Sequence, residues 1–123
     1  MKEQSISQSL SDESECLYVF GKCSNENLKF LVDSGASHNF LPSLFVSRRS
    51  FREERGPLVS VRLANGTLLR TNRFCFLWVN FGEVSSYLKF TVLPCECPMI
   101  LGMPFLRRLN PLINWQTRTL SFA

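Results

Sequence analysis

Short apolar runs, separated every few positions by polar or turn-forming residues, follow one another from residue 16 to the end of the chain. Residues 16–21 and 28–32 are two such runs, and the polar, asparagine-containing stretch 24–27 between them favours a turn. The pattern predicts a β-hairpin whose second strand ends directly before Asp33.

A second hairpin is predicted in the middle of the chain. Residues 58–63 alternate apolar and polar side chains, and residues 68–70 resume the apolar pattern. The residues between them include Asn65-Gly66, and Asn-Gly between two such runs is a strong short-range signal for a tight turn. The polar stretch 48–57 before this hairpin predicts a loop.

The rest of the pattern predicts further short strands and a single helix. Residues 74–79 are apolar at every position, which is typical of a strand buried on both faces. The helix is expected over residues 104–109, with Pro104 in its first turn and Asn110-Pro111 after its end. We therefore expect an all-β fold, a small closed barrel or sandwich with one short C-terminal helix. The other expected segments are extended pieces at residues 40–42, 87–93, 112–115 and 119–122, and a helical turn at residues 43–47.

The length of the chain fits one domain. The chain has 123 residues, 45% of them hydrophobic, which is enough apolar material for one packed core. Residues 1–15 are rich in serine, glutamate and glutamine, so we expect a flexible polar leader there and a folded domain over residues 16–123. No apolar run reaches the roughly 18–20 residues of a membrane span, and the first residues lack the apolar stretch of a signal peptide, so a cytoplasmic protein is expected.

The five cysteines are expected to be free thiols, because they are odd in number and no secretory signal precedes them. Cys95 and Cys97 form a lone Cys-x-Cys pair, with no second pair and with His38 as the single histidine of the chain. A metal site would lack its ligands, so neither a metal nor another cofactor is expected.

The net charge of +4 is unevenly distributed along the chain. Residues 1–15 carry a net charge of −3, so the remaining residues carry +7. A basic surface of this kind could bind nucleic acid or another acidic partner. We favour a solvated loop, because no motif for reading nucleic acid accompanies the four clustered arginines, Arg48, Arg49, Arg52 and Arg55.

Asp33 has the setting of a functional carboxylate. It comes directly after an apolar strand and is followed by the small residues Ser34, Gly35, Ala36 and Ser37. A strand end fixes the carboxylate in place, and small residues let the backbone of a ligand approach closely. By itself Asp-Ser-Gly is more often an ordinary turn, so the wider sequence context decides its interpretation.

That context resembles one family. Residues 31–40, Leu-Val-Asp-Ser-Gly-Ala-Ser-His-Asn-Phe, resemble the Asp-Ser/Thr-Gly-Ala signature of the retropepsin family. The extended motif is similar to gypsy-type retrotransposon proteases and to genes domesticated from them. Residues 99–106 are similar to the family's apolar-apolar-Gly segment with its following helix, and residues 114–122 are similar to its closing hairpin. The Asn65-Gly66 hairpin lies where the family places its flap.

The resemblance implies a homodimeric aspartic endopeptidase with the retropepsin fold. This chemistry needs two carboxylates that share one proton. The chain contains two aspartates, and Asp12 lies in the polar leader, so the catalytic pair is expected to be Asp33 from each of two identical chains. We expect inactive monomers, an acidic pH optimum, and an extended peptide or a retroelement polyprotein as substrate.

The resemblance also implies roles for other residues. Ser34 would hydrogen-bond across the two-fold axis, and Gly35 would leave room for the substrate backbone. Ala36 and Ser37 would line the cleft. His38 is expected to anchor the loop by hydrogen bonds rather than to act as a second acid or base. The flap and substrate-binding residues would be Leu63, Ala64, Asn65, Gly66 and Thr67, and the residues that support the loop would be Ile100, Leu101 and Gly102.

Two other functions remain as alternatives. A domesticated relative could be catalytically silent and use the same dimer to bind peptides, and the +7 body could serve a nucleic-acid-binding module. The intact Asp-Ser-Gly-Ala sequence favours the enzyme, because a carboxylate on a symmetry axis costs desolvation and repulsion that a structural role does not need. The hairpin of residues 112–122 is the expected dimer contact, and Trp78 and Trp115 are expected in the core or in contacts between subunits.

Overall fold

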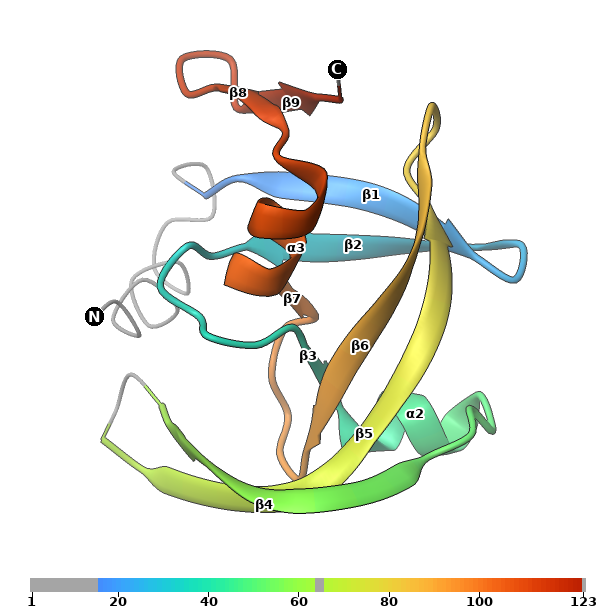
Figure 1. The fold of residues 1–123 in the computed structure, drawn as a ribbon, viewed down its shortest axis with the longest axis vertical. Helices are drawn as coiled ribbons and strands as arrows, with labels where there is room; N and C mark the ends of the chain where they lie inside the picture. The colour runs from blue at the N-terminus through green and yellow to red at the C-terminus, as the bar shows by residue number, and fades with distance from the viewer. Residues whose placement is uncertain (1–15, 64–65, 123) are drawn as a thin grey trace.

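The computed structural model describes residues 16–63 and 66–122 of the chain (Figure 1). Within these ranges the chain is mostly β-structure with two short helices. The strands are β1 (Tyr18–Cys23), β2 (Glu26–Val32), β3 (Phe40–Pro42), β4 (Glu54–Arg62), β5 (Leu68–Asn80), β6 (Ser85–Leu93), β7 (Ile100–Leu101), β8 (Leu112–Asn114) and β9 (Thr119–Ser121), and the helices are α2 (Ser43–Arg48) and α3 (Met103–Leu109).

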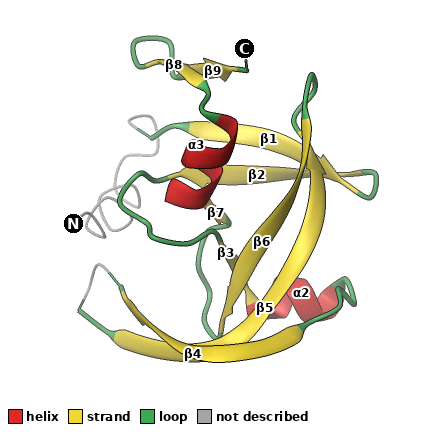
Figure 2. Ribbon diagram, in the orientation of Figure 1, coloured by secondary structure: helices red, strands yellow, loops and turns green. Residues whose placement is uncertain are grey.

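Seven of the strands form one sheet that closes into a barrel (Figure 2). Their order is β1-β2-β7-β3-β6-β5-β4, and β1 also pairs with β5 through Lys22 and Asn80. The pairing of β1 with β5 closes the sheet into a ring. β4 pairs with β5 but lies outside that ring. The expected all-β fold with a small closed barrel is therefore confirmed, while β8 and β9 form a separate two-stranded sheet.

The first hairpin has the expected strands and a tighter turn than expected. β1 and β2 pair in antiparallel fashion from Tyr18 and Leu31 to Cys23 and Glu26. Two residues make the turn, with φ of 49° and 69°, which is the geometry whose twist matches that of the flanking strands. These turn residues are Ser24 and Asn25.

The second hairpin is present at the expected place and is longer than its sequence pattern predicts. β4 begins at Glu54, inside the stretch 48–57 that was expected to be a loop. β5 is one continuous strand from Leu68 to Asn80. At the tip, the Leu63 N–H donates to the Thr67 carbonyl at 2.8 Å. Gly66, whose N–H donates to the Leu63 carbonyl at 2.9 Å, has φ of +90°, a conformation that favours glycine.

The core fills the barrel with aromatic and aliphatic side chains. Phe30 and Phe90 stack with their ring centroids 5.9 Å apart, and Phe105 of α3 is also fully buried. Leu41 of β3 and Val46 of α2 are also fully buried and belong to the same core.

The prediction that residues 74–79 are buried on both faces is wrong. Every second side chain faces the core, whereas Trp78 on the opposite face is 63% exposed and packs against the ring of Tyr87, 5.2 Å away. The outer face of this strand therefore carries aromatic rings that pack against one another, and Trp78 is not a core residue. The side chains that do face the core are Cys75, Leu77 and Val79.

Both helices are short. α3 agrees with the prediction, since Pro104 lies in its first turn and Asn110 ends it with φ of 44°. The helical turn expected over residues 43–47 extends by one residue and forms α2, so the described chain has one helix more than predicted. The physical reason is Val46, whose fully buried side chain fastens α2 to the barrel.

The C-terminal hairpin of β8 and β9 stands apart from the barrel, at the top of Figure 1. Phe122 fastens it, because its ring lies 5.7 Å from the Phe81 ring and 6.3 Å from the Phe105 ring. Leu112 and Trp115 of the hairpin are 63% and 68% exposed, so Trp115 is not a core residue either. None of the described helices is long and apolar enough to cross a membrane.

Candidate active site

Asp33 lies at the end of β2, where a neighbouring strand fixes its backbone. β2 runs parallel to β7, with Leu31 opposite Ile100 and Val32 opposite Leu101. The Asp33 N–H donates to the Leu101 carbonyl at 3.0 Å. Ile100 and Leu101, which the sequence resemblance names as loop support, thus lie directly beside the strand that carries Asp33.

The Asp33 carboxylate is buried and only half satisfied. The residue is 5% exposed, and its Oδ1 accepts a hydrogen bond from the Gly35 N–H at 2.8 Å. Its Oδ2 is buried without a hydrogen-bond partner, the single such side-chain atom among the residues that the structure describes. Because a buried carboxylate oxygen without a partner is costly, Oδ2 calls for a partner beyond the residues that the structure describes.

Backbone contacts hold the turn after Asp33 closed. The Ala36 N–H donates to the Asp33 carbonyl at 3.1 Å, and the Met103 N–H donates to the Ala36 carbonyl at 2.9 Å. Gly102 lies so close to this turn that a Cβ on it would be 2.4 Å from the His38 carbonyl oxygen. The start of α3 and the Asp33 loop can approach this closely only because residue 102 has no side chain.

The other predicted loop residues differ in exposure. Ser34 and Ser37 are exposed and Gly35 is half-buried, whereas Ala36 is buried. Ala36 belongs to a small apolar group, here called the wall cluster, that consists of Leu31, Ala36, Phe40, Leu93 and Ile100.

Asn39 is a site residue to which sequence reasoning gave no role. It is 2% exposed, and its Nδ2 donates to the Lys89 carbonyl at 3.1 Å. Its Oδ1 accepts from the Gly102 N–H at 2.8 Å. Asn39 thus ties the Asp33 loop to β6 and to the start of α3. The available signal was a polar residue directly before the apolar pair Phe40-Leu41, which indicates a buried polar group but not its partners.

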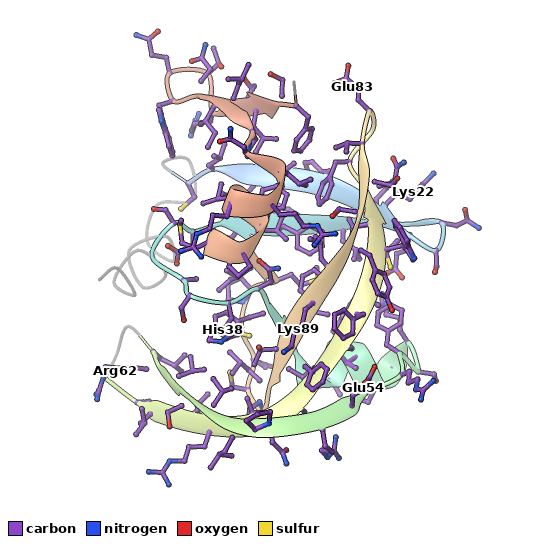
Figure 3. The ribbon with its side chains drawn as sticks, in the orientation of Figure 1. Lys22, His38, Glu54, Arg62, Glu83 and Lys89 are labelled. Atoms are coloured by element: carbon purple, nitrogen blue, oxygen red, sulfur yellow. The ribbon has the colours of Figure 1, made fainter. Side chains whose placement is uncertain are left out.

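His38 contacts two near neighbours in the sequence. Its Nδ1 lies 2.9 Å from the Ser37 Oγ, and its ring lies 5.8 Å from the Phe40 ring. Burial, and to a smaller extent the positive charge of Lys89, lower the pKa of His38 below its ordinary value (Figure 3). The imidazole is therefore neutral at neutral pH.

The hairpin of β4 and β5 lies on the same side of the barrel as the Asp33 loop (Figure 1). Val61 of β4 packs against the wall cluster, so the strand that leads to the hairpin tip and the Asp33 loop share one apolar wall. Three of the five predicted flap residues are described at the tip, namely Leu63, Gly66 and Thr67. The other two, Ala64 and Asn65, lie outside the described residues.

The residues that the structure describes contain no group of three or more side chains that could hold a metal ion. The described cysteines form no disulfide: Cys23 and Cys75 are buried, and Cys16, Cys95 and Cys97 are half-buried.

The sequence matches one protein-family model, which is described as the PEG10/RTL1 protease domain and covers residues 29–123. This span includes the Asp33 loop, the hairpin of β4 and β5 and the C-terminal hairpin. No curated protein sequence matches the chain.

Two solved structures are similar in fold. EIAV protease, solved in complex with the inhibitor HBY-793, is 16% identical with a TM-score of 0.64, and the match covers 80% of this chain and 92% of that one. The retroviral protease-like domain of Ddi1 from Leishmania major is 20% identical with a TM-score of 0.61, and the match covers 87% of each chain. At these identities the likeness shows the fold alone.

Proposed function

The chain belongs to the PEG10/RTL1 protease-domain family, and from its retropepsin-like fold and its Asp33 loop we propose that it is an aspartic endopeptidase that works as a homodimer. One observation carries the proposal: Oδ2 of Asp33 is buried and has no hydrogen-bond partner within the described chain. A second Asp33, brought to this oxygen by a two-fold axis, would supply that partner.

The catalytic pair would need one aspartate from each chain. Asp33 and Asp12 are the aspartates of the sequence, and Asp12 belongs to the N-terminal residues outside the described part. Two carboxylates that meet at an axis cannot both ionise cheaply, so they share one proton. The shared proton gives each carboxylate a hydrogen bond and leaves one of them as an acid and the other as a base.

The acid and the base divide the reaction between them. The ionised Asp33 takes a proton from a water molecule, whose oxygen attacks the carbonyl carbon of the scissile peptide bond. The protonated Asp33 gives its proton to the carbonyl oxygen, which produces a tetrahedral diol. Transfer of a proton to the amide nitrogen then lets the carbon–nitrogen bond break. No covalent bond to the enzyme forms at any step.

The substrate would be an extended peptide segment, within a retroelement polyprotein or its counterpart for a domesticated enzyme. Such a peptide can add to exposed backbone as a strand and place alternate side chains in pockets. The buried wall cluster supports the Asp33 loop from inside the barrel, and Val61, on the strand that leads to the flap, packs against it. Closure of the hairpin tip would exclude water from the reaction. EIAV protease, which shares the fold, holds the inhibitor HBY-793, and this supports a ligand-binding role here.

The neighbours of Asp33 would complete the site. Exposed Ser34 would hydrogen-bond across the two-fold axis, and Gly35, whose N–H already binds Asp33, would leave room for the substrate backbone. Ala36 and Ser37 would line the cleft. In this proposal the protease domain spans residues 16–123, residues 1–15 are its leader, and the enzyme acts in the cytoplasm.

The C-terminal hairpin is the proposed dimer contact. It projects from the barrel, and Leu112 and Trp115 expose most of their apolar surface. The strands β8 and β9 also line an open hollow of about 310 Å³, into which a partner could pack. Contiguous apolar patches on a protein surface mark interaction sites, and both of these side chains belong to the same short hairpin.

The direct test is peptide cleavage by the wild-type chain and by Asp33→Asn, at mildly acidic pH, with pepstatin as the inhibitor control. Asp33→Asn keeps the size of the side chain and its hydrogen bond from Gly35, so the fold should persist. Because general acid–base catalysis contributes about 10²–10⁴-fold, cleavage should fall by at least that factor.

Glu54→Gln is the matched control, since it removes an exposed carboxylate on β4 and should leave cleavage unchanged (Figure 3). Equal cleavage by wild type and Asp33→Asn would contradict the proposal. A folded dimer that cleaves no peptide in a diverse library would indicate a silent peptide-binding module instead.

A further inference from the structure

Two half-buried thiols lie in the loop between β6 and β7 and have no part in the proposed mechanism. The loop reads Pro94-Cys95-Glu96-Cys97-Pro98, so one residue separates the two thiols. Both are free and partly accessible. Both also pack against the wall cluster, so the two thiols contact the same group of side chains. The loop therefore presents a dithiol at the protein surface.

The position of this dithiol connects it to the candidate site. Cys95 and Cys97 pack against the wall cluster, which contains Ala36 of the Asp33 loop. Val61 of β4 packs against the same cluster. The thiol loop, the Asp33 loop and β4 therefore meet at one cluster, so a change in the shape of the thiol loop would act on both of the others through it.

We propose that Cys95 and Cys97 form an oxidisable dithiol, and that its closure into a disulfide reshapes the wall of the candidate cleft and lowers peptide binding. The effect on peptides rests on the proposed function, whereas the thiol chemistry and the change in the wall do not. A peroxide is the oxidant in this proposal.

The chemistry needs the peroxide and the two thiols alone. Cys95 attacks the peroxide, the oxygen–oxygen bond breaks, and a sulfenic acid forms with release of water. The Cys97 sulfur then attacks the sulfenic sulfur, a sulfur–sulfur bond forms, and a second water leaves. Two thiols are oxidised and one peroxide is reduced to two waters. A dithiol reductant reverses the reaction by exchange.

The surroundings of Cys95 and Cys97 give the two thiols different roles in the oxidation. Burial, followed by the nearby Cys95, raises the pKa of Cys97 above its ordinary value, so Cys97 is the less reactive thiol toward the peroxide and serves as the resolving thiol. Burial likewise raises the pKa of Cys75 to about 12, and Cys23 is buried beside it in the core. Both core thiols are therefore protected from oxidants. Cys16, which also packs against the wall cluster, is the competing partner.

Disulfide closure should move the loop. Pro94 and Pro98 flank the pair, and the ring of each proline fixes its φ. Residues 95–97 must therefore absorb the rotation that brings the two sulfur atoms into bonding distance. Leu93 and Ile100, at the two ends of the loop, are buried members of the wall cluster, so the strain acts on that cluster.

The test uses the full chain, reduced or treated with hydrogen peroxide, followed by disulfide mapping of its peptides and by amide hydrogen exchange. We expect a Cys95–Cys97 disulfide that dithiothreitol reverses, with altered exchange over residues 33–40 and 58–62. Cys95→Ser should abolish both effects, and Cys16→Ser, the matched control, should preserve both. Cleavage by the oxidised protein should fall at least about fivefold, a typical size for coupling between two sites.

A disulfide to Cys16, an unreacted pair, or a Cys95–Cys97 disulfide that leaves the exchange of residues 33–40 and 58–62 unchanged would overturn the inference. The proposed function is judged separately, by cleavage with the fully reduced protein. Reduced protein that cleaves nothing would refute the protease, and the mapping and exchange would still decide the dithiol.

Discussion

Asn39 holds the Asp33 loop in place without chemistry of its own. Its buried amide accepts a hydrogen bond from Gly102 and donates one to the Lys89 carbonyl. A buried polar group left without its partner costs about 1–3 kcal/mol. Asn39 therefore stabilises the loop mainly because its removal would take a partner from one buried and one partly buried backbone group.

Asn39→Ala should lower the free energy of unfolding by about 2–4 kcal/mol, because one buried and one partly buried hydrogen bond lose a partner each. Urea denaturation measures this change. Asn114→Ala is the matched control: the Asn114 Oδ1 also accepts backbone hydrogen bonds, from Gln116 and Thr117, but it does so at an exposed turn where water can replace it. A cost for Asn39→Ala no larger than that for Asn114→Ala would contradict this account of the loop.

The sequence indicated Asp33 and its small neighbours but not Asn39's partners. The Asp-Ser-Gly-Ala motif is local, so the turn and the position of its carboxylate follow from adjacent residues. The bond from Gly102 to Asn39 joins residues 63 positions apart. Such a contact depends on how β7 inserts between β2 and β3, and the two-residue strand β7 is too short to leave a periodic pattern.

The strand that leads to the flap is tied to the barrel by an ion pair. Glu53, directly before β4, accepts hydrogen bonds from Nε and Nη2 of Arg73 on β5, at 2.6 and 2.8 Å. Both side chains are about three-quarters buried or more, and the hydrogen bond from Arg73 lowers the pKa of Glu53 below its ordinary value of 4.5. The pair holds the base of the hairpin while its tip extends toward the Asp33 loop.

Glu53→Gln should lower the free energy of unfolding at pH 7 by about 1 kcal/mol, a value reduced for partial exposure. A lowered folded-state pKa stabilises the fold above the ordinary value of 4.5, and this stabilisation disappears as the pH falls through the lowered value. The stability difference between wild type and Glu53→Gln should therefore shrink toward zero in acid, as followed by thermal unfolding across pH. Glu83→Gln, at an exposed turn, is the control. A difference that persists unchanged at pH 3 would argue against the ion pair.

The elements with strong local patterns were predicted, and those that depend on pairing were not. The hairpin with Gly66 at its tip and the helix that starts beside Pro104 follow from nearby residues. Residues 54–57 have the sequence of a loop. In the structure, however, Glu54 pairs with Phe74 and Arg55 pairs with Arg73, and the register of the two strands shifts between Arg55 and Val59. The outer face of β5 was misread because apolar composition does not reveal that its rings pack on one another at the surface.

The whole molecule is proposed to be a dimer joined through its C-terminal hairpin, and one substitution tests that contact. Trp115→Glu should shift the protein to monomers in sedimentation velocity and reduce cleavage in proportion, because a charge would enter an apolar interface. Trp78→Glu is the matched control, since Trp78 is equally exposed but lies on the outer face of β5. Dissociation by Trp78→Glu and not by Trp115→Glu would place the interface elsewhere.

The central claim is that one active site uses Asp33 from two chains. Wild-type and Asp33→Asn chains are mixed in varied proportions at constant total concentration, allowed to exchange subunits, and assayed for cleavage. If both carboxylates are required, activity falls as the square of the wild-type fraction, because only dimers of two wild-type chains are active. Activity that falls in direct proportion to the wild-type fraction would show that a single Asp33 suffices and would contradict the account.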